Sequence, residues 1–234
     1  MGKLKKNFLF GAKDGLPIAL GYLAVSFSFG MAASSAGVPV WVSVALSAFN
    51  MTSAGQFSAL TLMCQSAPLG EIAAATFVIN IRYLLMSLVL SQRLIKMPVL
   101  ARMAVGFGVT DEIFTVASTK PHKVGFLYMM GLIAVPYLGW ASGTFLGAAA
   151  GNLLGDAVSS ALGIGLYAMF VAIVLPQARS ERSVMAAALI AVGMACVFRW
   201  WDALAVVSDG WAVIIASVLA AAAAAWLFPR REEA

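Results

Sequence analysis

Four polar side chains lie within one short stretch of an otherwise apolar segment, FNMTSAGQFSAL, which begins at Phe49. They are the amides and hydroxyls of Asn50, Thr52, Ser53 and Gln56, with Gly55 among them. Glycine weakens a helix by about 1 kcal/mol relative to alanine. A helix that breaks at membrane depth frees N–H groups, which bind carboxylates, and carbonyl groups, which bind cations. The stretch therefore predicts a binding site for a small zwitterion, although hydrogen bonding between helices would use the same side chains.

Arg82 lies near the middle of another apolar block, EIAAATFVINIRYLLMSLVL. A charge at that depth costs about 2.5–3.5 kcal/mol, so it needs a carboxylate, backbone carbonyls or water. Asp111 and Glu112, in GVTDEIFTV, are the best carboxylate candidates, and burial would also suit them to proton coupling. Three roles stay open for the arginine: an ion pair that fixes helix register, a role in substrate or proton binding, and a side chain that reaches to the interface.

The elements that must position these residues are apolar helices. Of the 234 residues, 62% are hydrophobic and 11% are charged, whereas a soluble domain carries about a quarter charged residues. The apolar residues form blocks near the roughly 20 residues that cross a bilayer as a helix. We therefore expect an all-α, polytopic integral membrane bundle with some helices broken mid-membrane. The blocks are Leu16–Ala36, Pro39–Met63, Ile72–Leu90, Gly125–Ala150, Ala157–Leu175, Val184–Phe198 and Trp211–Phe228.

Lysine and arginine mark the cytoplasmic side of a membrane protein. They place both termini inside, with 1–14 as a basic cytoplasmic segment and 229–234 as the tail of one transport domain spanning 1–234. The basic loop that carries Arg93, Lys96 and Arg102 does not fit a simple count. Either Val105–Ser118 is a short span, giving about eight apolar helices, or 91–123 stays inside and 39–63 is re-entrant, giving about six spans. We favour the first alternative, and both keep the termini together inside.

Glycines recur at every fourth position in the block after residue 125, at Gly139, Gly143 and Gly147. In lipid, small residues let helix backbones approach closely, because packing replaces the hydrophobic drive between helices. We expect this stripe to pack against another helix, either of this chain or of a partner chain.

Four short motifs follow one another along the chain: GLPIALGYLAVSFSFGMAA, TSAGQFSAL, NIRYLL and TDEIF. In this order and spacing they resemble the AzlC-type branched-chain amino acid permease family. One pair departs from the family pattern, because Thr52 and Ser53 stand where alanine and glycine are usual, which leaves the substrate side chain open. The family positions carried by the last three motifs are Gln56, Phe57, Asn80, Arg82, Thr110, Asp111, Glu112 and Phe114.

The resemblance implies an inner-membrane permease that exports branched-chain or similar small amino acids together with a small AzlD-type membrane protein. The expected transport path is Asn50, Thr52, Ser53, Gln56, Phe57, Asn80 and Arg82, with Asp111 and Glu112 for proton coupling or an ion pair. We expect a secondary transporter without cofactor, metal or nucleic acid, and not an enzyme, since neither a Walker-type loop nor a metal or serine-base pattern occurs. A membrane scaffold subunit, or a transporter or channel for another solute, is the alternative.

Overall fold

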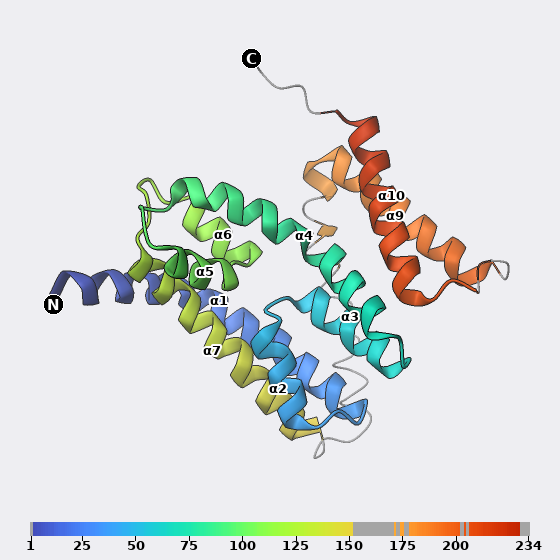
Figure 1. Cartoon of the computed structure of the whole chain (residues 1–234), viewed down its shortest axis with the longest axis horizontal. Helices are drawn as coiled ribbons and strands as arrows, with labels where there is room; N and C mark the ends of the chain where they lie inside the picture. Colours follow the sequence, from blue (N-terminus) through green and yellow to red (C-terminus); the bar gives the residue numbers. More distant parts are fainter. Residues whose placement is uncertain are drawn as a thin grey trace. The chain divides into compact units, whose positions relative to one another are not determined.

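The structure, a computed structural model, describes residues 2–151, 171, 174–175, 178–201, 204 and 206–229, with side chains from Asn7 onward. Every regular element in these ranges is an α-helix, which confirms the all-α expectation for them, and one isolated β-bridge there joins Leu94 and Val124. The helices are α1 (Gly2–Ser35), α2 (Val40–Phe49), α3 (Ser53–Cys64), α4 (Leu69–Arg93), α5 (Val99–Phe107), α6 (Asp111–Ser118), α7 (Phe126–Gly151), α9 (Arg182–Trp200) and α10 (Asp209–Leu227) (Figure 1).

Within the described ranges, 5 helices are long and apolar enough to cross a bilayer: α1 from Asn7, α4, α7, α9 and α10. Helix α2 is also apolar but shorter. The expected block Ala157–Leu175 lies outside the described residues apart from positions 171, 174 and 175. Helix α1 begins at Gly2, so the basic N-terminal segment is helical and continuous with the first apolar block. A membrane-spanning helical class is thus supported, while the number of spans and the side of each terminus stay predictions.

The apolar segment 39–63 is not one helix. Helix α2 ends at Phe49 and α3 begins at Ser53, so the chain is interrupted at the polar residues singled out in the sequence. Asn50 is the residue that closes α2, with φ −128° and ψ 79°, which lies outside the helical region.

The segment Val105–Ser118, expected as one short span, is not one continuous helix either. Helix α5 ends at Phe107, and α6 begins at Asp111 after an extended Thr110 with φ −125° and ψ 173°. Ile133 packs where a Cβ of Gly108 would lie, so a glycine is needed at the turn between the two helices. The second interruption places the two acidic residues in the first turn of α6.

The chain forms two compact units, and both α3 and α4 contribute residues to each of them. Unit 1 contains Met1–Phe57 and Asn80–Gly163, and unit 2 contains Ser58–Ile79 and Ile164–Ala234. All residues of the candidate site lie in unit 1.

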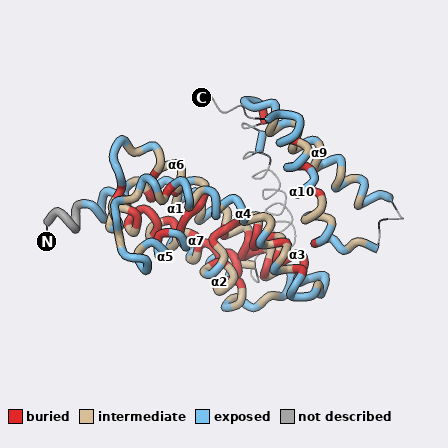
Figure 2. Tube along the Cα trace, turned by 45° about the horizontal axis from the view of Figure 1, so that its top comes forward, coloured by how far each residue is buried: buried red, intermediate tan, exposed pale blue. Residues whose placement is uncertain are grey.

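In unit 1, α1 and α7 pack side by side along their length (Figure 1), and buried residues follow their contact (Figure 2). The two helices run parallel, since Gly131 lies against Phe8 near their starts and Gly147 lies against Phe27 near their ends. The predicted glycine stripe therefore packs against a helix of the same chain. A Cβ on Gly139, Gly143 or Gly147 would meet the backbone carbonyl of Ala19, Leu23 or Phe27, respectively.

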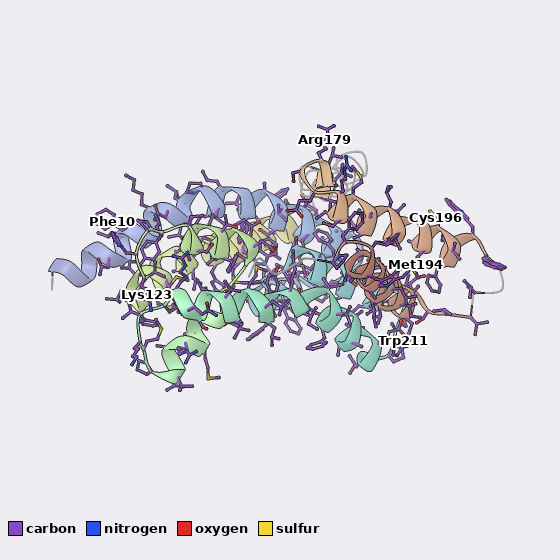
Figure 3. All side chains as sticks on the ribbon, turned by 90° about the horizontal axis from the view of Figure 1, so that it is seen from above. Phe10, Lys123, Arg179, Met194, Cys196 and Trp211 are labelled. Atoms are coloured by element: carbon purple, nitrogen blue, oxygen red, sulfur yellow. The ribbon has the colours of Figure 1, made fainter. Side chains whose placement is uncertain are left out.

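Unit 2 pairs α9 with α10, and Figure 3 shows Cys196, a free thiol, on α9 and Trp211 at the start of α10. The start of α10 meets the region where α3 ends and α4 begins. The hydroxyl of Ser208 donates to the buried carboxylate of Glu71, and Gln65 Nε2 donates to Asp209 Oδ2 at 2.6 Å. A carboxylate at a helix N-terminus is favourable because the peptide dipoles leave partial positive charge there. Glu71 therefore holds this end of α10 and takes no part in the site of unit 1.

Candidate functional site

At the first interruption, the polar side chain of Thr52 caps the start of α3. Thr52 Oγ1 accepts a hydrogen bond from the Gly55 N–H at 3.4 Å, and the Thr52 N–H donates to the Asn50 carbonyl at 2.7 Å. Threonine is a preferred residue before a helix, because its hydroxyl satisfies one of the first N–H groups. The Gln56 N–H donates to the Thr52 carbonyl at 3.0 Å, so the N–H groups of Ser53 and Ala54 remain without a helical partner, and N–H groups at helix starts can bind anions.

The second interruption repeats this arrangement. Thr110 Oγ1 accepts a hydrogen bond from the Ile113 N–H at 3.4 Å, and α6 then starts with Asp111 and Glu112. The positive end of the helix dipole stabilises carboxylates in this turn. The short α6 therefore presents two acidic side chains at a fixed place in unit 1.

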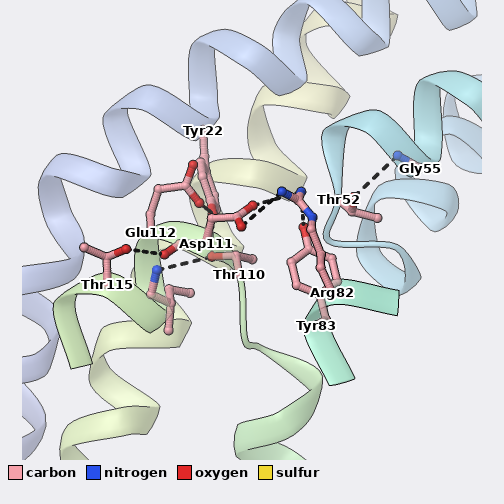
Figure 4. Close-up of polar contacts among 10 residues, drawn as sticks. Tyr22, Thr52, Gly55, Arg82, Tyr83, Thr110, Asp111, Glu112 and Thr115 are labelled. Atoms are coloured by element: carbon pink, nitrogen blue, oxygen red, sulfur yellow. Dashed lines mark hydrogen bonds and ion pairs between the residues drawn. The ribbon is translucent and has the colours of Figure 1, made fainter. Parts of the chain in front are cut away.

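Arg82, from the middle of α4, reaches Asp111 (Figure 4). Its two terminal nitrogens lie 3.1 and 2.9 Å from the two carboxylate oxygens, which is the two-point geometry that guanidinium and carboxylate groups favour. The side chains remain 47% and 45% exposed, respectively. The pair is therefore open on one side to whatever surrounds unit 1, and it is not enclosed by the protein.

The neighbours of Arg82 on α4 connect it to the first interruption. The Tyr83 hydroxyl accepts a hydrogen bond from Arg82 at 3.3 Å, and the guanidinium lies 5.0 Å from the centre of the Tyr83 ring. Tyr83 also interacts with the Thr52 side chain. Asn80, one turn earlier, lies against Gly55, where a Cβ would come within 2.9 Å of Asn80 Nδ2. One stretch of α4 thus contacts the start of both α3 and α6.

Tyr22 of α1 closes the acidic side of the site (Figure 4). Its hydroxyl lies 2.6 Å from Thr110 Oγ1 and 2.5 Å from Glu112 Oε2. A phenol carries one hydrogen, so it donates to one of these partners while the other contact needs a second donor, either the threonine hydroxyl or a protonated Glu112. The Tyr22 ring packs edge-on against Trp140 of α7, with ring centres 5.1 Å apart.

Gln56 lies in a separate, fully buried network. Ser47 of α2 donates to Gln56 Oε1 at 3.0 Å and lies 2.6 Å from Thr144 Oγ1 of α7. This network ties α2, α3 and α7 together inside the protein, which is the alternative use considered for such side chains. Three buried polar atoms have no protein partner among the described residues: Gln56 Nε2, Asn80 Oδ1 and Trp140 Nε1.

The predicted site residues thus fall into four groups. Thr52, Asn80, Arg82, Asp111 and Glu112 come together around the two interruptions, whereas Gln56 is enclosed beside them. Asn50 and Ser53 flank the first interruption and are partly buried. Phe57 packs edge-on against Phe29, with ring centres 5.1 Å apart, as part of the apolar interior.

Sequence reasoning did not find Tyr22 or Tyr83, although a signal for them exists. A tyrosine inside an apolar block needs a hydrogen-bond partner for its hydroxyl, so each marks a polar neighbour in the fold. Ser47 and Thr144 were missed as well, because single hydroxyls are common in membrane helices and do not identify their partner.

The charges of the site do not balance. Arg82 supplies one positive charge, while Asp111 and Glu112 supply two carboxylates, and the dipole of α6 offsets part of the difference. In a region of low dielectric constant, an uncompensated negative charge attracts a proton or an ammonium group. The arrangement can therefore hold a cationic group beside Glu112 and an anionic group near Arg82 and the free N–H groups of α3.

This fold and site define a polytopic helical membrane protein with a polar site at interrupted helices, an organisation known from secondary transporters. The model of the AzlC protein family matches residues 17–154, and the chain belongs to that family. The matched region contains every residue of the candidate site.

Two relatives support the assignment. The chain is 29% identical over 143 residues to the inner membrane protein YgaZ of Escherichia coli, across 59% of this chain and 58% of the relative. It is 30% identical over 150 residues to an uncharacterized membrane protein of Archaeoglobus fulgidus, across 62% of this chain and 64% of the relative. The matched stretch thus covers about three fifths of the length of these curated relatives. No solved structure matches the chain.

Proposed function

We propose that this chain is a secondary transporter that exports branched-chain or similar small hydrophobic amino acids across the bacterial inner membrane. The observation that carries the proposal is the half-exposed Arg82–Asp111 pair between two helix starts. An amino acid carries one carboxylate and one ammonium group, which match the guanidinium and the acidic side chains of this site. The proposal assigns no covalent chemistry to the chain.

Substrate binding exchanges partners within the ion pair. The substrate carboxylate replaces Asp111 at the Arg82 guanidinium, helped by the free N–H groups of α3, and the substrate ammonium lies between Asp111 and Glu112. Because each charge of the pair finds a new partner, neither is left unpaired at membrane depth, which would cost several kcal/mol. An amine without a carboxylate, or an acid without an ammonium group, leaves one partner unsatisfied and is expected to bind poorly.

The charge imbalance supports coupling to protons. When no substrate is bound, only one of the two carboxylates has a cationic partner among the described residues, so the site has room for one proton. A bound zwitterion adds no net charge to the site. Its ammonium takes the place of the proton, and the dipole of α6 and the Tyr22 hydroxyl offset the one negative charge that then remains. Competition between a proton and an ammonium group for one position produces exchange of the two across the membrane, and an inward proton gradient then drives export.

We also propose a small AzlD-type membrane protein as the partner, as the family resemblance implies. Helix α9 supports a surface for it, because none of its residues is buried within the described part of the chain. Leu189, Val192 and Trp200 are each 60–77% exposed, and a Cβ on Gly193 would meet nothing within 4 Å. Co-purification of the two chains, and its loss on Gly193→Trp, would test this contact.

The transport proposal is tested with the full chain, with and without the partner, in proteoliposomes loaded with labelled leucine. Arg82→Gln and Asp111→Asn are expected to lower the rate of efflux by at least about 100-fold, in the range that loss of a charged contact in a buried pair produces. Arg93→Gln is the matched control, since it removes an arginine from the same helix outside the site.

Full efflux by both site variants would contradict the assignment of residues. Efflux that is absent from the unaltered chain but appears when the partner alone is reconstituted would instead support the alternative, in which this chain is a scaffold subunit.

A further inference from the structure

A cavity in unit 1 lies between the last turns of α4 and the length of α5. The α4 side is lined by Ser87, Leu90, Ser91 and Leu94, and the α5 side by Val99, Arg102, Met103 and Gly106. Within each set the residues follow one another at the spacing of a single helix face. Two facing helix surfaces therefore form a groove, whose volume is about 250 Å³.

The floor and walls of the groove are mainly apolar. Leu90, Val105 and Val109 form a floor that is no more than 4% exposed, whereas Val99 and Met103 on the α5 side are 70% and 64% exposed. The volume is below the range of about 300–1,000 Å³ that is usual for sites of drug-sized ligands. An open apolar groove of this size suits part of a longer chain that continues beyond it.

The mouth of the groove is positively charged. Arg102 lines it, and Arg93 and Lys96 lie in the same turn region between α4 and α5. Among the described residues, no carboxylate pairs with any of these three side chains. Ser87 also has no partner in that part of the chain, whereas Ser91 donates to the Leu88 carbonyl at 2.6 Å. Because α4 ends at Arg93, the basic residues of this turn region lie near the end of a helix that is long and apolar enough to cross a membrane, where lipid headgroups are found.

We propose that this groove binds one anionic phospholipid. The phosphate contacts the Arg102 guanidinium, and one acyl chain lies over Leu90, Val105 and Val109. Charge complementarity selects an anionic headgroup, as in basic pockets between membrane helices. Such a site gives the basic loop of Arg93, Lys96 and Arg102 a role as a lipid contact. The positive-inside rule alone did not account for this loop. The groove shares no residue with the transport site, so each proposal can be tested independently of the other.

Native mass spectrometry of the purified full chain tests the proposal, with phosphatidylglycerol and phosphatidylethanolamine of identical acyl chains as probes. The unaltered chain is expected to retain one phosphatidylglycerol more tightly than phosphatidylethanolamine. Arg102→Gln should weaken that first binding event about fivefold, the effect of one basic residue near an anionic headgroup. Gly106→Leu should prevent it by filling the groove, since a Cβ there meets nothing within 4 Å and the fold accommodates it. Lys96→Gln is the matched comparison and should weaken the first binding event less than Arg102→Gln does, because Lys96 does not line the groove.

Several results would overturn the proposal. Equal retention of the two lipids would show that charge does not select the occupant. Equal weakening by Arg102→Gln and Lys96→Gln would indicate a diffuse basic surface, and displacement of the lipid by inorganic phosphate would indicate a site for a free anion. If Gly106→Leu fails to fold, the comparison of the two lipids and of the two charge variants still tests the proposal.

Discussion

Arg82 and Asp111 form a two-point ion pair that is about half exposed when the chain is considered alone. Exposed pairs in water contribute about 0–1 kcal/mol, whereas loss of one partner from a buried pair costs about 3–5 kcal/mol. Lipid cannot hydrate the exposed side, so the surroundings of this pair lie between the two cases. The pair is therefore strong enough to persist without substrate and open enough for a substrate to replace either partner.

A double-mutant cycle measures how strongly the two side chains depend on each other. Arg82→Gln and Asp111→Asn each leave one charge unpaired, whereas the double variant leaves none. We expect a coupling free energy of about 1 kcal/mol or more from thermal unfolding in detergent, with the double variant more stable than the sum of the single effects. Strictly additive effects would show that the pair does not form in the folded protein.

At this scale, the sequence predicted the charged members of the site but not their aromatic neighbours. The cost of a charge in an apolar block singled out Arg82 and directed the search to Asp111 and Glu112. Tyr22 is uncharged, so it does not carry the cost of a charge in an apolar block. Its contact with Glu112 depends on how α1 packs against α6, and the sequence pattern does not show this packing. Gln56 shows the opposite case, because its polarity suggested an open site while the fold encloses it with Ser47 and Thr144.

At the scale of elements, the parallel pair α1 and α7 is the frame on which the site is built. Glycines along both helices bring their backbones together, and Tyr22 on α1 and Trp140 on α7 then meet beside the start of α6. The stripe on α7 was evident from its four-residue spacing. The helix that packs against the stripe was not evident from the sequence, because the glycines of α1 are less regularly spaced. A helix of a second chain would also have fitted the stripe.

Gly147→Ala tests this packing. The added Cβ would overlap the Phe27 carbonyl, which is backbone and cannot rotate away, so the helices must separate. We expect a loss of about 1–3 kcal/mol in the free energy of unfolding, seen as a lower Tm by circular dichroism in detergent. Gly21→Ala is the matched control on α1, because its Cβ meets nothing within 4 Å and alanine favours helix. Equal Tm values for the two variants would contradict the close contact.

The interrupted helices were only partly predictable. Gly55 and the hydroxyls of the first stretch indicated a break, and the structure has one between Phe49 and Ser53. The division of Val105–Ser118 was not expected, because the capping role of Thr110 and the contact of Gly108 with Ile133 depend on the fold. Helices α5 and α6 have 9 and 8 residues, so each is too short to span a bilayer alone.

At the scale of the whole molecule, the parallel run of α1 and α7 constrains topology. Both helices start at the same end of the pair, where Lys120 of the loop before α7 lies 2.8 Å from Asp14 of α1, and Tyr128 donates to the same carboxylate. The chain between the two helices must therefore return to the side from which α1 began. Both topological alternatives satisfy this condition, and it agrees with placing the basic N-terminus and the loop at 120–123 on one side.

The central claim is that a proton and an amino acid exchange at the site formed by Arg82, Asp111 and Glu112. The most direct test measures proton movement with a pH-sensitive dye sealed inside proteoliposomes, when an outward or inward leucine gradient is imposed without a pH gradient. We predict that leucine and protons move in opposite directions through the unaltered chain, and that Glu112→Gln allows leucine exchange while proton movement ceases. Leucine flux through the unaltered chain without proton movement, or unchanged proton movement in Glu112→Gln, would contradict the account.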